Sequence, residues 1–240
     1  MRILNISLMV LTIGLSAATW AKASELRAVA ANLPPYAIED GAKGFNLELS
    51  RLAAERAGYT LEVEFLPWKR AQKMVQEADD LLAFNLTRTE KREPLYKWIT
   101  PLIEYSNVFV TTTTSIDTFE TAAERGETLA RSGTPQERRI SGSGIPYREI
   151  GSPEQAVRML DAGRASAWFT HDRRAEWVWK QEKRSNQLVL GASQGSGTIY
   201  LAASPNFPAD KADALRAAVE ELRADGTYDA LMEKYFGPVR

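Results

Sequence analysis

Two strand-like runs, residues 107–113 and 198–203, bracket a long block with its own alternation of strand-like and helix-like segments. Both runs are rich in the β-branched and aromatic residues that favour strands. The same alternation recurs before and after the block, and it is typical of α/β layers. A domain inserted into another, with two strands crossing between them, is the simplest explanation of this order.

The sequence therefore predicts an α/β protein of two lobes, each a sheet flanked by helices. We expect the first lobe to comprise residues 24–108 and 199–240, and the second lobe residues 109–198. The last two predicted helices, residues 209–223 and 227–235, return to the first lobe.

Within the first lobe, periodicity predicts the order of elements. Residues 45–57 place apolar side chains on one helical face and stop at Gly58. Residues 59–65 alternate apolar and polar side chains, which predicts a half-buried strand. A second helix is expected over residues 68–77, and an apolar strand starts at Leu81.

The N-terminal residues have the three parts of a secretory signal. Arg2 precedes an apolar run over residues 3–15, and small residues lead to the A-x-A site Ala21-Lys22-Ala23. The run is shorter than the roughly 20 apolar residues that a membrane anchor needs. We expect residues 1–23 to be cleaved and the mature chain to begin at Ser24, outside the cytoplasm.

Composition excludes several classes of function. The formal net charge is −1, and it becomes −3 once Arg2 and Lys22 are removed with the signal segment, which does not favour nucleic-acid binding. Without a single Cys, the chain cannot form disulfides or carry a lipid on an N-terminal cysteine. One His and no Cys argue against a transition-metal site, and we expect no metal or cofactor.

The segment Ala83–Arg92 carries the strongest functional signal. An apolar strand runs into Thr87-Arg88-Thr89-Glu90, a capping-box pattern that predicts a helix start, and Arg92 follows within two turns. A helix N-terminus offers unpaired N–H groups and partial positive charge, and an arginine adds a fork of donors. This combination suits a carboxylate.

A second helix start that could bind an anion lies in the inserted block. Thr134-Pro135-Gln136-Glu137 places a cap residue, a Pro at the first helical position and a Glu at the third, directly after Gly133. The chain would thus offer one helix N-terminus per lobe. If both face a shared cleft, a small anion can be held from two sides.

With these residues in place, the mature chain resembles the type 2 periplasmic solute-binding proteins, in the branch of amino-acid receptors of ABC transporters. Residues 85–92 are similar to the S/T-x-T-x-x-R segment in which the Arg grips the ligand's α-carboxylate, and Arg92 falls on that position. Asn85 and Thr87 fall on neighbouring ligand-contacting positions. Trp68 matches the aromatic residue that covers the ligand in the first lobe.

In the second lobe, Gly133-Thr134-Pro135 resembles the turn that completes the carboxylate cradle. Gly163-Arg164-Ala165-Ser166-Ala167 resembles the G-R-x-D-A segment, after which the family's amine-binding Asp would fall at or beside His171-Asp172. Ser166 replaces the usual Asp, and Ala30 or Ala31 stands where receptors for cationic amino acids keep an Asp. These departures disfavour a basic amino acid and leave a dicarboxylate or an aromatic acid as alternatives.

The resemblance implies a periplasmic type II binding fold and a monomer, without enzyme activity, that captures a small carboxylate-bearing solute between hinged lobes. The solute would pass to an ABC transporter, with a membrane permease as partner. The expected ligand-binding residues are Arg92, Thr87, Asn85, Trp68, Thr134, Gly133, Arg70, Asp172 and Tyr36.

Two other functions stay open. The chain also resembles periplasmic cyclohexadienyl dehydratases, which implies acid/base chemistry by His171, Asp172 or Glu104. A sensory receptor is the third alternative. Three of the expected site residues also have an alternative that does not involve the ligand. Trp68 could pack in the core, Arg70 could point into solvent, and Asp172 could cap a helix that begins at Arg173.

Overall fold

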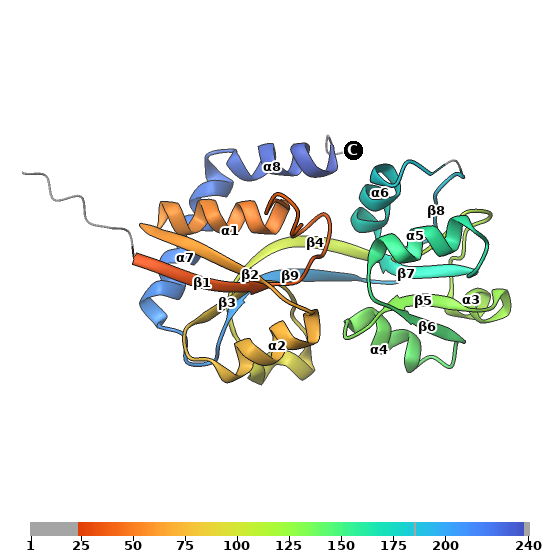
Figure 1. Cartoon of the computed structure of the whole chain (residues 1–240), viewed down its shortest axis with the longest axis horizontal. Coiled ribbons are helices and arrows are strands. Elements are labelled where there is room, and N and C mark those ends of the chain that lie inside the picture. The colour runs from red at the N-terminus through yellow and green to blue at the C-terminus, as the bar shows by residue number, and fades with distance from the viewer. Residues whose placement is uncertain (1–23, 185, 238–240) are drawn as a thin grey trace, which may run out of the picture.

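The computed structural model describes residues 24–184 and 186–237; the expected signal segment, residues 1–23, lies outside them. It is a mixed α/β fold of two lobes, and strands β4 (Lys97–Thr111) and β9 (Ser196–Ala203) run from one lobe into the other (Figure 1). The long β4 begins ten residues before the strand-like run recognised in the sequence. Its N-terminal part contains polar residues and Pro101, which weaken the strand pattern.

Lobe 1 contains the N-terminal half of the chain and the last two helices. In order, its elements are β1 (Ser24–Ala30), α1 (Phe45–Arg56), β2 (Tyr59–Phe65), α2 (Trp68–Glu77), β3 (Leu81–Thr87), the 3-10 helix η1 (Glu90–Leu95), α7 (Ala209–Ala224) and α8 (Thr227–Phe236). The helices and strands expected in residues 45–77 are confirmed within one residue.

Lobe 2 is built from shorter elements. They are α3 (Phe119–Arg125), β5 (Thr128–Arg131), α4 (Pro135–Ser141), β6 (Tyr147–Ile150), α5 (Pro153–Asp161), β7 (Ala167–His171), α6 (Asp172–Gln181) and β8 (Val189–Leu190).

The strands follow the order β2-β1-β3-β9-β4-β7-β5-β6, with β8 also paired to β4. Within each lobe the first strands are parallel, β1 to β2 and β3 in lobe 1, and β5 to β6 and β7 in lobe 2. Strands β4 and β9 are antiparallel to each other and to their outer neighbours. The two crossing strands therefore form the only sheet connection between the lobes in the described part of the chain.

Each lobe has its own apolar core on both faces of its sheet. In lobe 1, α1, α7 and α8 cover one face with Leu49, Phe84 and Leu215 at its centre, and α2 covers the other with Val75 (Figure 1). These side chains are at most 1% exposed, and each contributes about 1.5–3 kcal/mol by burial. The apolar cores of the two lobes are thus separate, and only the crossing strands join the sheets of the lobes within the described residues.

One predicted helix start is wrong. Thr87 is the last residue of β3 and pairs with Ile199, and no helix begins directly after it. Only the 3-10 helix η1 follows, with Thr89 at its start, no side-chain cap and Pro94 inside. No α-helix therefore begins at Thr87, and Arg92 lies within the 3-10 helix η1.

The helix starts expected in lobe 2 are confirmed. Thr134 Oγ1 accepts a hydrogen bond from Glu137 N at 3.2 Å, with Pro135 in the first turn of α4. Ser152 Oγ accepts from Gln155 N at 3.2 Å at the start of α5. No helix among residues 24–184 and 186–237 has the length and apolar character needed to cross a membrane.

Candidate functional site

A small closed cavity lies between the lobes, with a volume of about 20 Å³. Lobe 1 lines it with Trp68, Asn85, Thr87 and Arg92, and lobe 2 with Thr134, Gln136, His171 and Arg174. This volume has room for about one water molecule. A larger solute enters only when the lobes move apart.

Arg92 is the buried guanidinium of lobe 1, with 5% of its surface exposed. Its Nη1 donates to Thr87 O at 3.1 Å, and its Nη2 donates to Gln72 Oε1 at 2.6 Å. No described carboxylate forms an ion pair with it. Burial, together with the nearby charge of Arg138, lowers its pKa to about 10, so it remains charged at neutral pH and suits an anion.

The other lobe 1 residues form the polar side of the cavity. Asn85 Oδ1 accepts a hydrogen bond from Asn46 Nδ2 at 2.8 Å, and its own Nδ2 has no partner among the described residues. The hydroxyl of Thr87 lies 3.1 Å from that of Tyr105. Trp68 is 9% exposed and packs with the core under α2 while it lines the cavity, so packing and ligand contact are compatible.

The turn before α4 brings lobe 2 up to Arg92. Gly133 has a φ of +75°, a conformation that favours glycine, and its carbonyl oxygen lies 3.5 Å from Arg92 Nη2. Thr134 Oγ1 donates to Arg131 O at 2.6 Å while it caps the helix. Three sequence-predicted residues of different lobes, Arg92, Gly133 and Thr134, thus meet here.

His171 ends β7 and faces the cavity. Its ring stacks on Tyr105 with centroids 3.5 Å apart, and its Nδ1 lies 3.4 Å from the hydroxyl of Tyr36. Its Nε2 has no hydrogen-bond partner in the described chain. Burial, and secondarily Arg174, lowers the pKa of His171 well below its ordinary value, so the ring is neutral near pH 7.

Two buried arginines of lobe 2 were missed by sequence reasoning. Arg174 is 3% exposed and lines the cavity, and Arg131 is 9% exposed at the end of β5. Arg131 Nη2 donates to Asn32 O of lobe 1 at 3.1 Å, while its Nη1 has no partner in the described residues. One sequence signal could have identified Arg174. It lies within the apolar face of α6, beside Ala175 and Val178, where a charged residue is unusual.

Four predicted site residues do not line the cavity: Gly133, whose carbonyl oxygen approaches Arg92, and Tyr36, Asp172 and Arg70. Tyr36 is fully buried behind His171. The carboxylate of Asp172 accepts from Arg173 N at 2.7 Å and Ser106 N at 3.2 Å, so it ties α6 to strand β4. Arg70 is exposed on α2.

A more open cleft adjoins the closed cavity. Its volume is about 530 Å³, and Trp68 lines both spaces. Lobe 1 adds Lys69 and Glu39 to the cleft, and lobe 2 adds Arg131 and Ser152. Another pocket of about 550 Å³ is confined to lobe 1 beside α2 and does not touch the cavity.

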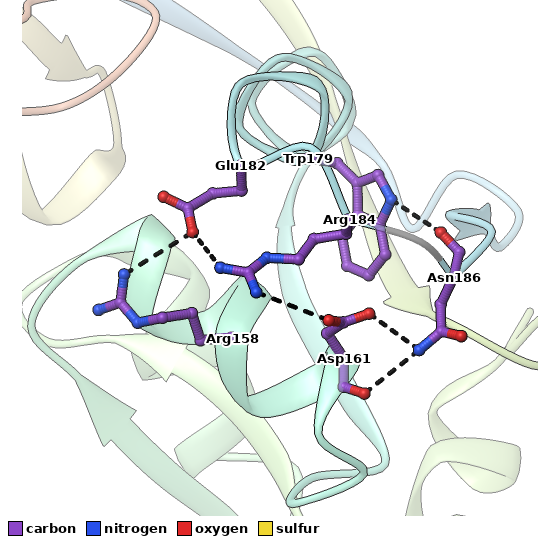
Figure 2. Close-up of polar contacts among 6 residues, drawn as sticks. All are labelled: Arg158, Asp161, Trp179, Glu182, Arg184 and Asn186. Atoms are coloured by element: carbon purple, nitrogen blue, oxygen red, sulfur yellow. Dashed lines mark hydrogen bonds and ion pairs between the residues drawn. The ribbon is translucent and has the colours of Figure 1, made fainter.

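The buried arginines differ from an ion-paired cluster elsewhere in lobe 2. Figure 2 shows Arg184 between Asp161 and Glu182, with Arg158 also paired to Glu182. Asn186 Nδ2 donates to Asp161 Oδ1 at 2.8 Å, and Trp179 Nε1 donates to Asn186 O at 3.1 Å, which fastens the segment after α6 to α5. Arg92, Arg131 and Arg174 form no such ion pair in the described chain.

The arrangement suits binding of an anion more than metal chemistry. Among the described residues, no group of three or more His, Asp or Glu side chains could hold a metal ion. Of the three acid/base candidates, only His171 lines the cavity. Glu104 lies instead in a separate groove beside Arg173, so the residues expected for a dehydratase are not brought together.

Comparison with known proteins gives a family match and a shared fold. The model of the bacterial extracellular solute-binding proteins, family 3, matches residues 27–238. None of the curated protein sequences matches this chain significantly.

The chain is similar to the GluR0 ligand-binding core from Nostoc punctiforme in complex with L-glutamate. The TM-score is 0.80 at 17% identity, with 89% of this chain and 100% of that chain covered. It is also similar to the ancestral amino acid-binding protein AncCDT-1, a precursor of cyclohexadienyl dehydratase, with TM-score 0.77, 19% identity and coverage of 89% and 96%. A third match is the substrate binding protein of an amino acid ABC transporter, with TM-score 0.73, 19% identity and coverage of 90% and 100%.

Proposed function

This chain belongs to the family 3 bacterial extracellular solute-binding proteins, and we propose that it captures a small carboxylate-bearing solute, an amino acid or a related organic acid, between its two lobes. The observation that carries the proposal is Arg92, a buried guanidinium without an acidic partner, in a cavity closed by the Thr134 turn. Burying a charge without a partner is costly, so such a residue favours an anionic ligand.

The contacts of Arg92 prepare it for a carboxylate. Gln72 and the carbonyl of Thr87 fix the guanidinium, while Thr87 and Thr134 line the same cavity with their hydroxyl-bearing side chains. A hydrogen bond to a charged group contributes about 1.5–3 kcal/mol. A paired carboxylate with a few such bonds would account for much of a micromolar affinity, about −8 kcal/mol.

Lobe closure would couple solute binding to a change of shape. Both halves of the cavity come from one chain, so a monomer is sufficient, and β4 and β9 supply the hinge between separate cores. A solute that contacts both lobes stabilises only the closed arrangement. A membrane partner can then distinguish the loaded from the empty protein.

The proposed setting is the periplasm, after cleavage of residues 1–23, with delivery to an ABC transporter. The family match and the likeness to a transporter's substrate binding protein support this role. A sensory role uses the same closure. Co-purification distinguishes the two roles: a transport protein would co-purify with a permease, and a sensory protein with a signalling protein.

The test uses purified mature protein and calorimetry with a panel of amino acids, dicarboxylates and aromatic acids. For the best ligand, Arg92→Gln is expected to weaken binding at least tenfold while the melting temperature of the unliganded protein stays near wild type. The matched control is Arg88→Gln, because Arg88 is exposed and ion-paired with Glu93 on the surface. Unchanged affinity in Arg92→Gln, or an equal loss in Arg88→Gln, contradicts the carboxylate assignment.

The dehydratase alternative rests on the likeness to AncCDT-1 and on His171 in the cavity. Incubation with prephenate or arogenate tests it directly. We expect no aromatic product, because Glu104 and Asp172 do not reach the cavity. Product formation that is lost in His171→Asn would favour the enzyme.

A further inference from the structure

The closed cavity contains one positive charge more than a single carboxylate requires. We propose that its solute is a small dianionic organic acid without an ammonium group, such as a short dicarboxylate. This inference rests on the proposed function and names the class of solute for the same site.

The two charges come from opposite lobes. Arg92 lies on the lobe 1 side and Arg174 on the lobe 2 side, with 5% and 3% of their surfaces exposed. Neither forms an ion pair with any described residue. By contrast, the less buried Arg184 of lobe 2 is paired with both Asp161 and Glu182 (Figure 2). Arg184 is thus ion-paired, whereas the two cavity arginines have no ion-pair partner among the described residues.

Arg174 is the more unusual of the two. Its guanidinium donates no hydrogen bond to the described residues, its Nε is buried without a partner, and its Cζ lies 5.3 Å from the centroid of the Tyr36 ring. Its neighbours Ala175 and Val178 are buried in the core of lobe 2. An anion in the cavity would supply the missing partner, because buried guanidinium groups need hydrogen bonds as well as charge compensation.

Among the residues that the structure describes, no acidic side chain lines the cavity. Asp172 directs its carboxylate to the backbone of Ser106 and Arg173, and Glu154, the acidic group that acts on Arg174 from α5, forms no ion pair with it. An ammonium group would face two guanidinium groups and the neutral ring of His171. Like charges in a poorly solvated space repel, so the cavity selects against zwitterionic amino acids.

The geometry assigns one anionic group to each side. The first would lie between Arg92 and Thr134, and the second between Arg174 and the unpartnered Nε2 of His171. Once the lobes have moved apart to admit the solute, a short apolar linker would contact Trp68 and Ile199, which also line the cavity. Binding would then draw both lobes onto one molecule.

The experiment compares matched ligands on the purified wild-type protein by calorimetry. Malonate, succinate, glutarate and adipate are the dianions; aspartate and glutamate add an ammonium to two of these skeletons, and butyrate and valerate keep one carboxylate. We expect at least one dianion to bind tenfold or more tightly than its amino and single-acid counterparts. An amino acid or single acid that binds as tightly overturns the inference.

These outcomes separate this inference from the proposed function. If an amino acid or single acid binds best and Arg92→Gln abolishes that binding, the carboxylate site stands and the dianion assignment is wrong. If none of these acids nor the wider carboxylate panel binds, both proposals are wrong.

A pair of variants locates the second anionic group. Arg174→Gln is expected to weaken the best dianion tenfold or more and to bring its affinity close to that of the single acid, whereas Arg173→Gln leaves both unchanged. Arg173 is adjacent on α6 but lines the groove beside Glu104 rather than the cavity. If Arg174→Gln does not fold, Arg174→Lys keeps the charge and should keep the preference for the dianion. A folded Arg174→Gln that retains the preference overturns the assignment.

Discussion

The Nη2 atom of Arg92 in lobe 1 lies 3.5 Å from the carbonyl oxygen of Gly133 in lobe 2. The guanidinium thus already touches the opposite lobe through a long, weak contact. A carboxylate is a stronger acceptor than a backbone carbonyl and would take this donor. The contact therefore marks where a solute would enter the interface between the lobes.

Thr134→Val is expected to lower both stability and solute affinity. The hydroxyl of Thr134 caps α4 and donates to Arg131 O, and it also lines the cavity. Removal of an N-cap costs about 1 kcal/mol. Urea denaturation measures the stability and calorimetry the affinity.

The control is Thr118→Val, which removes the N-cap of α3 away from the cavity, where Thr118 Oγ1 accepts from Thr121 N at 3.1 Å. It should lose stability to a similar or smaller extent and keep full affinity. Equal affinities in the two variants would mean that Thr134 has only a capping role.

Gly197→Ala is expected to destabilise the hinge. A Cβ at this position would lie 2.3 Å from the hydroxyl oxygen of Tyr105 and 2.5 Å from its Cζ. Tyr105 cannot easily move, because it stacks on His171 and bonds to Thr87. Overpacking of this kind costs about 1–3 kcal/mol.

Chemical denaturation checks this cost, with Gly151→Ala as the comparison. A Cβ on Gly151 would meet its nearest atom at 3.8 Å, so stability should stay near wild type. A Gly197→Ala protein as stable as Gly151→Ala would show that the hinge yields without penalty.

The sequence predicts the layers of this fold well, because each depends on local periodicity. Residues 45–56, 59–65 and 68–77 form the expected elements almost residue for residue. The caps at Thr134 and Ser152 also form, since their bonds reach only three residues along the chain. Elements and caps that depend on such short-range patterns can be predicted without knowing the tertiary structure.

The sequence failed where tertiary pairing overrode a local pattern. Thr87 and Glu90 have the spacing of a capping box, yet pairing with Ile199 holds Thr87 in the sheet. The burial of Arg174 depends on how α6 meets the other lobe, which no local pattern encodes. Asp172 was an expected site residue with helix capping as its competing role, and its carboxylate accepts a hydrogen bond from the backbone of Ser106 in β4.

The mature protein is expected to begin at Ser24. The A-x-A pattern at Ala21–Ala23 predicts the cleavage, and Ser24 is the first residue of β1, so every described strand is kept. Intact-mass measurement of protein exported from a bacterial host checks this. A mass that includes residues 1–23 in exported protein would contradict the prediction.

Stability is expected to fall between pH 7.5 and pH 5.5 because of His171, the only histidine in the chain. Its pKa in the folded state lies well below the ordinary 6.5, owing to burial and to Arg174. The unfolded chain therefore binds a proton below pH 6.5 that the folded chain excludes, so falling pH favours unfolding. The stabilisation is fully present above that pH.

One such group changes the free energy of unfolding by up to about 1.4 kcal/mol per pH unit, so we expect a loss of about 1.4 kcal/mol at pH 5.5. Urea denaturation at the two pH values measures it. The lowered carboxyl pKa values of Glu48 and Asp225 act at more acidic pH and do not enter this window. His171→Asn should therefore remove most of this pH dependence. If the variant loses as much stability as wild type between pH 7.5 and pH 5.5, His171 is not the origin of the pH dependence.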